Sequence, residues 1–290
     1  MEITASMVKD LREKTGAGMM DCKKALVETN GDMDKAIDYL REKGISKAAK
    51  KAERIAAEGL SNIYVDGNNA VVVELNSETD FVAKNAEFKE LLDTIGNTIL
   101  ANDAETLEDA LNLETGNGTI NDLVVAATAK IGEKISLRRF EKVTKEDNQV
   151  FGSYLHMGGR IASLTVVEGE NEEAAKDVAM QAAAMRPLYT SIENVPAEDV
   201  EHEKEVITKQ VIEEGKKPEF ADKIVEGRIR KFYEETVLEE QAFIKDSGLT
   251  VKAYLANNNS KLVKLVKFEV GEGMEKRNDN FAEEVMSQIK

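Results

Sequence analysis

The spacing of the apolar residues changes near residue 58, and this change constrains the fold more than any other feature of the sequence. Before it, apolar residues recur at helical intervals, as they do over 33–40. After it, β-rich runs at 60–65 and 70–75 flank the polar residues 66–69, which predicts a hairpin. A chain that combines both patterns is expected to have an α+β fold.

The pattern of strands and helices beyond residue 58 occurs twice. The first half continues with a long helix that places Phe88, Leu92, Ile95 and Ile99 on one face, two shorter helices near 106–113 and 120–131, and a strand at 134–140. The second half has strands at 151–156 and 161–167, a helix at 172–185, and a closing strand only at 261–270. This common order predicts a duplicated core of two antiparallel sheets, each covered on one face by helices.

Residues 197–238 interrupt the second half and predict two amphipathic helices joined by a turn at 215–218. Their apolar residues form one narrow seam, with Val200, Ile207 and Val211 facing Val225, Ile229 and Phe232. The segment is therefore expected to form an antiparallel helical hairpin. It could be a decoration of the core or an arm that reaches a partner, and the residues leave both open.

The first 45 residues predict a compact three-helix domain, in which Thr4 and Asp32 cap the first and third helices and Asn30-Gly31 ends the second. A unit of this size is marginally stable by itself, which favours a docking role. We predict five parts: a three-helix domain at 1–45, a solvated helical linker at 46–57, core subdomains at 58–143 and 144–277 with the hairpin in the second, and a C-terminal helix at 278–290.

Composition excludes most kinds of chemistry. The chain has 55 acidic and 39 basic residues and a net charge of −16, which disfavours direct binding of nucleic acid. One cysteine, Cys22, rules out an internal disulfide or a multi-cysteine zinc site, and we expect it to be a buried thiol. The sequence has no phosphate-binding glycine motif, no hydrolase motif, and no apolar run near the ~18 residues that cross a membrane. We therefore expect no enzyme, no metal site and no membrane segment.

Four stretches of the sequence stand out: residues 11–26, 74–84, 130–139 and 268–273. They resemble the elongation factor Ts family. The predicted layout is also similar to that family, with an N-terminal domain like ubiquitin-associated domains. The resemblance implies an exchange factor that binds elongation factor Tu with GDP, disturbs its Mg²⁺ and phosphate site, and stays bound until GTP enters. The metal and the nucleotides belong to the partner, so no cofactor of this chain is implied.

In this resemblance Thr79, Asp80, Phe81 and Val82 would enter beside the partner's switch region and dislodge Mg²⁺. The residues also allow two structural roles. Ser77 and Asp80 fit a capping box, and Phe81 could extend the buried face of the following helix. Asn85 favours an exposed turn instead, because it interrupts that face and is a good N-cap.

The resemblance also implies docking contacts. Arg12, Met19 and Met20 would bind the partner from the N-terminal domain, and His156 is a further candidate contact. Only one of two adjacent helical residues can face a helix core, so we expect one of the two methionines to be buried and the other exposed.

The alternative is an adaptor that binds another protein through the three-helix domain without changing a nucleotide equilibrium. Whether the chain forms homo-oligomers cannot be read from the sequence. We expect a cytoplasmic protein, since the Met1 start favours a bacterial cytoplasm over an organelle reached after removal of a targeting segment.

Overall fold

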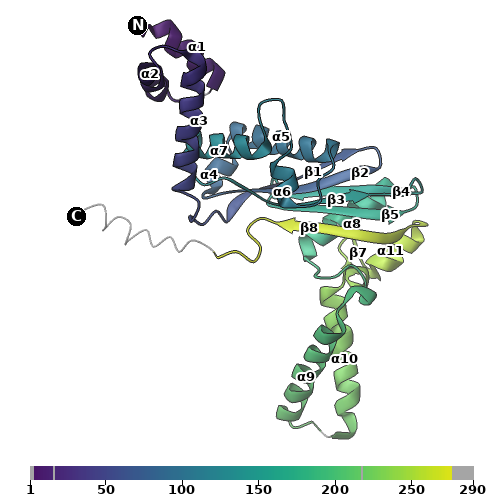
Figure 1. Cartoon of the computed structure of the whole chain (residues 1–290). Helices are drawn as coiled ribbons and strands as arrows, with labels where there is room; N and C mark the ends of the chain where they lie inside the picture. Colours follow the sequence, from purple (N-terminus) through teal and green to yellow (C-terminus); the bar gives the residue numbers. More distant parts are fainter. Residues whose placement is uncertain (1–2, 16, 217, 276–290) are drawn as a thin grey trace. The chain divides into compact units, whose positions relative to one another are not determined.

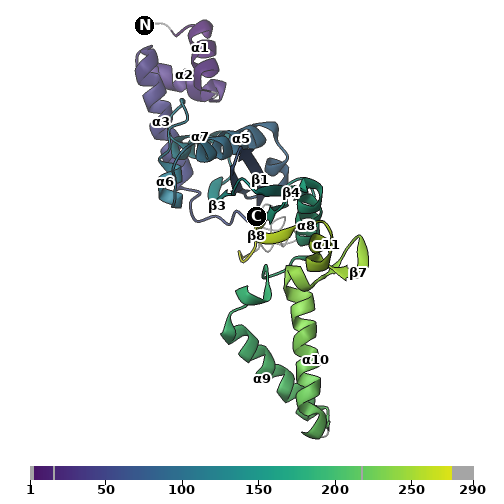
Figure 2. The same ribbon diagram turned by 90° about the vertical axis from the view of Figure 1, so that its right-hand side faces the viewer.

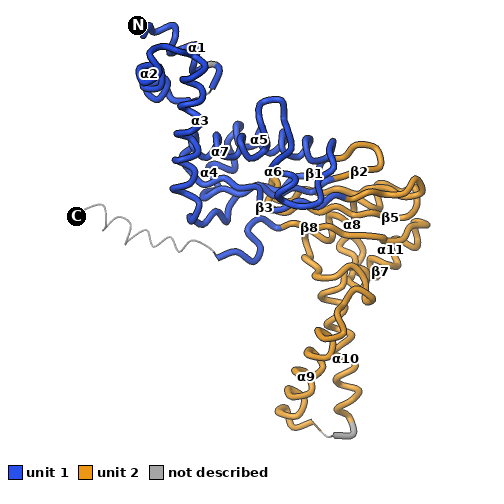
Figure 3. Tube along the Cα trace, viewed as in Figure 1, with its two compact units in different colours: residues 1–64, 71–142, 269–290 blue, residues 65–70, 143–268 orange. Residues whose placement is uncertain are grey.

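The computed structural model describes residues 3–15, 17–216 and 218–275 (Figure 1). The chain divides into two compact units, one made of residues 1–64, 71–142 and 269–290 and the other of residues 65–70 and 143–268 (Figure 3). N-terminal helices are followed by small antiparallel sheets and further helices, which confirms the predicted α+β class. The C-terminal helix predicted at 278–290 lies outside the described residues.

Three helices open the first unit: α1 (Ala5–Thr15), α2 (Met19–Glu28) and α3 (Met33–Ala49). The Thr4 hydroxyl accepts from the Met7 amide at 3.3 Å, and the Asp32 carboxylate accepts from the Lys35 amide at 3.1 Å, which confirms both predicted N-caps. Gly31, with φ of 82°, takes the left-handed conformation that ends α2. The helices enclose a small apolar core of Val8, Leu11, Cys22, Ala25, Leu26 and Ala36.

The predicted helical linker at 46–57 is wrong beyond Ala49, where α3 ends. Helix α3 packs along α7 (Ile120–Ile131), although the residues of the predicted linker that it contains, 46–49, are exposed or half-buried, as expected of a solvated segment. Gly44 of α3 faces α7 so closely that a side chain at this position would touch Ala129. This close approach of the two helices is at Gly44, before the alanine-rich segment that suggested a linker.

The sheet of the first unit has the order β1-β2-β3, with strands β1 (Glu58–Asp66), β2 (Asn69–Ser77) and β3 (Ser136–Thr144). Its hairpin turn is Gly67-Asn68, tighter than the predicted four residues, and Gly67 has a φ of 55°. Between β2 and β3 come α4 (Asp80–Ala83), α5 (Ala86–Ala101), α6 (Leu107–Leu111) and α7. The predicted face of α5, Phe88, Leu92, Ile95 and Ile99, is buried against β2, as expected.

A buried carboxylate in this sheet binds a segment from the end of the described chain, which follows the last strand in the sequence. Glu74 of β2 is fully buried and lies 2.9 Å from Arg138 and 2.6 Å from Arg139, two neighbouring residues of β3. It also accepts from the Gly271 amide at 2.9 Å. Pairing with two guanidinium groups and a backbone donor compensates for the removal of this charge from water.

The sheet of the second unit has the order β4-β5-β8, formed by β4 (Gln149–His156), β5 (Ile161–Glu168) and β8 (Lys261–Glu269). Helix α8 (Glu172–Met185) covers one face, at the predicted position. Gly152 permits this contact, because a side chain there would overlap the backbone of Ala175. The strands predicted at 151–156, 161–167 and 261–270 are therefore confirmed.

The hairpin predicted at 197–238 is present as α9 (Ala197–Glu213) and α10 (Pro218–Thr236). Among its described side chains Ile207, Val211 and Ile229 are buried, while Val200, Val225 and Phe232 of the predicted seam are only half-buried. The two helices meet toward the turn that joins them (Figure 2). Several short elements around the hairpin were not predicted from the sequence. They are η1 (Ile192–Asn194), η2 (Leu238–Glu240), β6 (Ala242–Phe243), β7 (Asp246–Thr250) and α11 (Val251–Asn257).

Candidate functional site

The segment Thr79–Val82 forms a single helical turn between β2 and α5. Thr79 is the N-cap of α4, since its hydroxyl accepts from the Val82 amide at 3.4 Å. Asn85 caps α5 in the same way through the Glu87 amide at 2.9 Å, as predicted. Two N-caps six residues apart prevent one continuous helix, so the chain must form a short separate turn here.

The aromatic ring of this turn points into solvent. Phe81 is 79% exposed, so it is not part of the helix core. Val82 is half-buried and Ala83 is buried, so the side of α4 that carries these two residues packs against the protein. Phe81 lies on the opposite, exposed side. Ser77 is not the N-cap of this turn, because that position is taken by Thr79, and the Ser77 hydroxyl donates to the Thr79 carbonyl at 2.9 Å. Both structural alternatives for this segment are therefore wrong.

Asp80 carries a negative charge beside the ring. Its carboxylate pairs with Lys84 at 2.6 Å, and the Lys84 ammonium lies 5.7 Å from the centre of the Phe81 ring. The Lys84 side chain is 71% exposed and that of Asp80 is 45% exposed. Exposed pairs of this kind contribute little to stability, so Lys84 can change partner at small cost.

Two carboxylates from different segments hold the turn. Glu133, which follows α7, accepts from the Thr79 amide at 3.0 Å and from the Thr79 hydroxyl at 2.7 Å. Glu78 accepts from the Lys134 amide at 2.6 Å and from Arg54 at 3.3 Å. Sequence reasoning did not single out these residues. The stretch 130–139 stood out only as a family-like segment, without any sign that it meets residue 79.

The residues predicted to dock from the N-terminal domain lie on the surface. Arg12 of α1 is exposed, and Met19 and Met20 of α2 are 55% and 76% exposed. The prediction that one methionine is buried is therefore wrong. Helix α2 begins at Met19, and its buried residues come later in the helix, at Cys22, Ala25 and Leu26. Cys22 is buried, as expected.

His156 lies at the end of β4, in the second unit, and is half-buried. Its ring is 6.1 Å from that of Tyr154, and its carbonyl accepts from the Gly159 amide at 3.2 Å. Met157 follows it with a φ of 50° and is 66% exposed. The other candidates all belong to the first unit: those of α1 and α2 lie on different elements from Thr79–Val82, and α3 connects their part of the chain to α7 (Figure 1).

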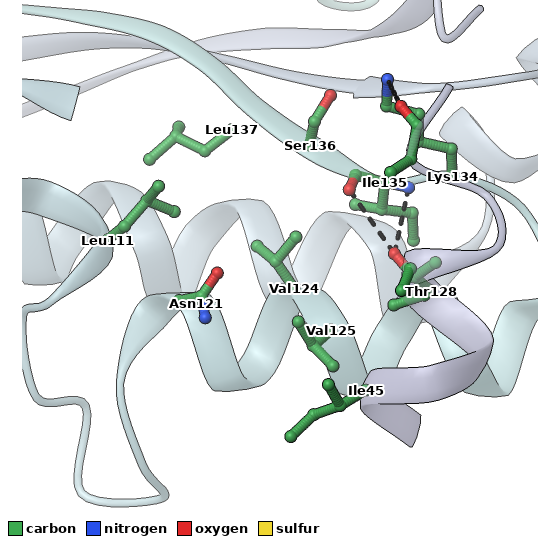
Figure 4. Close-up of a pocket in the computed structure, with 13 residues that line it drawn as sticks. Ile45, Leu111, Asn121, Val124, Val125, Thr128, Lys134, Ile135, Ser136 and Leu137 are labelled. Carbon is green, nitrogen blue, oxygen red and sulfur yellow. Dashed lines mark hydrogen bonds between the residues drawn. The ribbon is translucent and has the colours of Figure 1, made fainter. Parts of the chain in front are cut away.

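One pocket of the first unit lies between α3, α7 and β3 (Figure 4). Its lining is mostly apolar, and Thr128, one of its few polar residues, is bonded to the Ile135 backbone. Among the described residues, no group of three histidine, cysteine or acidic side chains could hold a metal ion. No described helix is long and apolar enough to cross a membrane.

The family model for elongation factor Ts matches residues 78–272. The chain belongs to the elongation factor Ts family. Its activity is nucleotide exchange on elongation factor Tu during translation elongation, so it binds that GTPase, performs no covalent catalysis and carries no cofactor of its own. The match includes Thr79–Val82, Glu133 and His156, whereas Arg12 and the two methionines lie before it.

Proposed function

We propose that the exposed turn Thr79–Val82 performs the exchange by entering elongation factor Tu beside its bound Mg²⁺ and GDP, and that the complex persists until GTP enters. One observation supports this most strongly: Phe81 is 79% exposed on a turn whose backbone is held at both ends. A large ring kept in water on an anchored turn contributes nothing to the protein's own core and is suited to contact another molecule.

The chemistry of the turn suits a metal and phosphate site. Mg²⁺ offsets the charge of the diphosphate, so disturbing its ligands leaves repulsion without compensation. The Phe81 ring is a stiff apolar wedge that can displace side chains of the partner. Asp80 brings a negative charge toward the diphosphate, which weakens GDP binding further.

The energetics require contacts elsewhere. Shifting a partner from 99% to 1% occupied by GDP takes about 10⁴-fold, or ~5.5 kcal/mol. The coupling is reciprocal, so bound GDP lowers the affinity of this chain for elongation factor Tu by the same ratio. We assign the compensating contacts to Arg12, Met19 and Met20, with His156 as a further contact in the second unit. The exposure of both methionines supports this role.

The proposal includes the finer architecture. The N-terminal domain would resemble ubiquitin-associated domains, and the core would be duplicated, with the boundaries predicted from the sequence. The sheet orders β1-β2-β3 and β4-β5-β8 support the duplication, because in each sheet the second strand of that half of the chain lies between its first and its last strand. The hairpin would then be an insert between α8 and β8, and the protein would act in the cytoplasm.

The test is release of a fluorescent GDP analogue from preloaded elongation factor Tu at saturating concentrations of this chain. Phe81→Ala should lower the maximal release rate by about 10- to 100-fold, since burial of a Phe side chain is worth ~1.5–3 kcal/mol. Affinity for nucleotide-free partner should fall much less. Phe220→Ala is the matched control, because Phe220 is also an exposed phenylalanine, at 53%, in α10.

Equal losses of rate and affinity in Phe81→Ala would contradict the proposal and make the turn a simple docking contact. Absence of acceleration by the intact chain would favour the adaptor alternative.

A further inference from the structure

The turn that carries Phe81 packs on the apolar core of the first unit through Ala83 and the half-buried Val82. Helix α4 is four residues long, and only Ala83 in it is buried. A helix this short is not stable by itself, because the first hydrogen-bonded turn costs more backbone entropy than it returns. The direction in which Phe81 and Asp80 are presented must therefore be fixed from outside the turn.

The external contacts are reciprocal. Glu78 and Thr79 face Glu133 and Lys134, and each pair consists of a glutamate followed by a residue that donates its backbone amide. The Thr79 amide donates to Glu133 at 3.0 Å, and the Lys134 amide donates to Glu78 at 2.6 Å. The Thr79 hydroxyl adds a third bond to Glu133 at 2.7 Å. Bonds from neutral donors to a carboxylate are among the stronger hydrogen bonds in proteins.

The loop that carries Glu133 is itself fixed. Gly132 ends α7 in the left-handed conformation, with φ of 89°, and its carbonyl accepts from Lys51. The Lys134 ammonium donates to the carbonyls of Ala52 at 2.7 Å and Arg54 at 3.0 Å. Glu133 thus projects from a loop tied to the segment that follows α3, which makes it a firm support for the turn.

We propose that Glu133 is a positioning residue for nucleotide exchange, whose carboxylate fixes Thr79 and thereby the orientation of Phe81 and Asp80. This inference rests on the proposed role of the turn. Glu133 acts through Thr79 and does not itself need to contact the partner.

The proposal makes a specific demand on the chemistry at residue 133. Thr79 presents two donors, its N–H and its O–H, and a carboxylate offers an acceptor oxygen to each. Each donor binds a different oxygen of Glu133, and a glutamine in the same position has an NH₂ group in place of one of these oxygens, so one of the two Thr79 donors would face another donor. Glu133→Gln should therefore be intermediate between wild type and Glu133→Ala.

The experiment measures maximal release of a fluorescent GDP analogue from elongation factor Tu, together with affinity for the nucleotide-free partner and the thermal melting of each variant. Glu133→Ala should lower the maximal rate on the order of tenfold, since misplacement of about 1 Å can cost more than that, while affinity changes much less. The control is Glu87→Gln, which removes a nearby negative charge that pairs with Lys130 at 3.0 Å without touching Thr79. It should release GDP at the wild-type rate.

A double-mutant cycle separates positioning from direct contact. When Phe81 is already alanine, Glu133→Ala should cause a smaller further loss of rate than it does with Phe81 intact, because one of the two groups that it orients is gone. Independent, multiplicative losses would overturn the proposal, and so would an unchanged rate in Glu133→Ala with Phe81 intact. The variant Thr79→Ser keeps both donors and should release GDP near the wild-type rate, whereas a loss equal to that of Glu133→Ala would contradict the proposal. If Phe81→Ala itself had no effect, the proposed function would fail instead.

Discussion

Two adjacent methionines show what decides the role of a single residue. Met19 and Met20 open α2 and are both exposed, while Cys22, Ala25 and Leu26 in the same helix are fully buried. Helical periodicity describes which face points inward, but it cannot tell whether another element covers the first turn. In the free protein both methionines therefore expose apolar surface to water, and a partner that binds over them can bury this surface.

This contrast predicts opposite effects of two substitutions in one helix. Met20→Ala should weaken the complex with elongation factor Tu by about tenfold and leave the free energy of unfolding nearly unchanged. Leu26→Ala should destabilise the protein by about 2–5 kcal/mol, because it leaves a cavity in the small N-terminal core. Titration calorimetry and urea denaturation measure the two effects. A stability loss in Met20→Ala as large as that of Leu26→Ala would show that the methionine packs in the core.

At this scale, local patterns predicted the N-caps Thr4, Asp32 and Asn85 and the buried face of α5, because each depends on residues within a few positions. The same reasoning could not find Glu133. Its partner Thr79 is 54 positions away, and nothing local distinguishes a carboxylate that reaches a distant backbone amide from one that is merely solvated.

Among the elements, α7 joins the N-terminal helices to the loop that carries Glu133. Its N-terminus carries a capping box between Thr119 and Asp122, and Asp122 also pairs with Arg41 of α3 at 2.8 Å. Burial raises the pKa of Asp122, but the hydrogen bonds from Thr119 and the Arg41 guanidinium outweigh it and hold the pKa of this carboxyl below its ordinary value of 3.8. The charged form therefore stabilises the folded protein.

The lowered pKa of Asp122 predicts a pH-dependent stability difference between wild type and Asp122→Asn. A depressed pKa contributes stability above the unfolded value, and the contribution is lost as the pH falls through the folded value. Urea denaturation should show wild type more stable by about 1 kcal/mol at pH 7 and this gap shrinking below pH ~4. A gap that stays constant down to pH 3 would mean that the charge of Asp122 does not stabilise the fold.

The presence of most helices and strands could be predicted from the sequence, whereas the residues at which they begin and end could not. The alanine-rich end of α3 predicts a helix from composition, yet its packing on α7 depends on a surface more than 70 residues further along the chain. The short strands β6 and β7 and helix α11 have too few residues for a periodic pattern, so they appear only in the three-dimensional structure.

For the molecule as a whole, the packing of the hairpin α9–α10 differs from that of the sheets. Its buried residues are Ile207, Val211 and Ile229, whereas β5 is buried along seven consecutive residues, from 161 to 167. Regions with few buried apolar contacts open at a lower free energy than the core. We expect the hairpin to unfold locally while α8 and β5 stay folded.

Native-state hydrogen exchange tests this expectation. Amides of α9 and α10 should exchange faster than those of α8 and β5, and Ile207→Ala should speed exchange in the hairpin alone. If Ile207→Ala speeds exchange equally in α8, the hairpin and the sheet unfold as one cooperative unit.

The most direct test of the central claim varies the metal. If the turn acts by disturbing Mg²⁺ in the partner, its effect should depend on that ion being present. With millimolar free Mg²⁺, Phe81→Ala should release GDP about 10- to 100-fold more slowly than wild type at saturation. With EDTA the partner has already lost the ion, and the two rates should converge. A defect of the same size in EDTA would contradict the account, because Phe81 would then act on something other than the metal site.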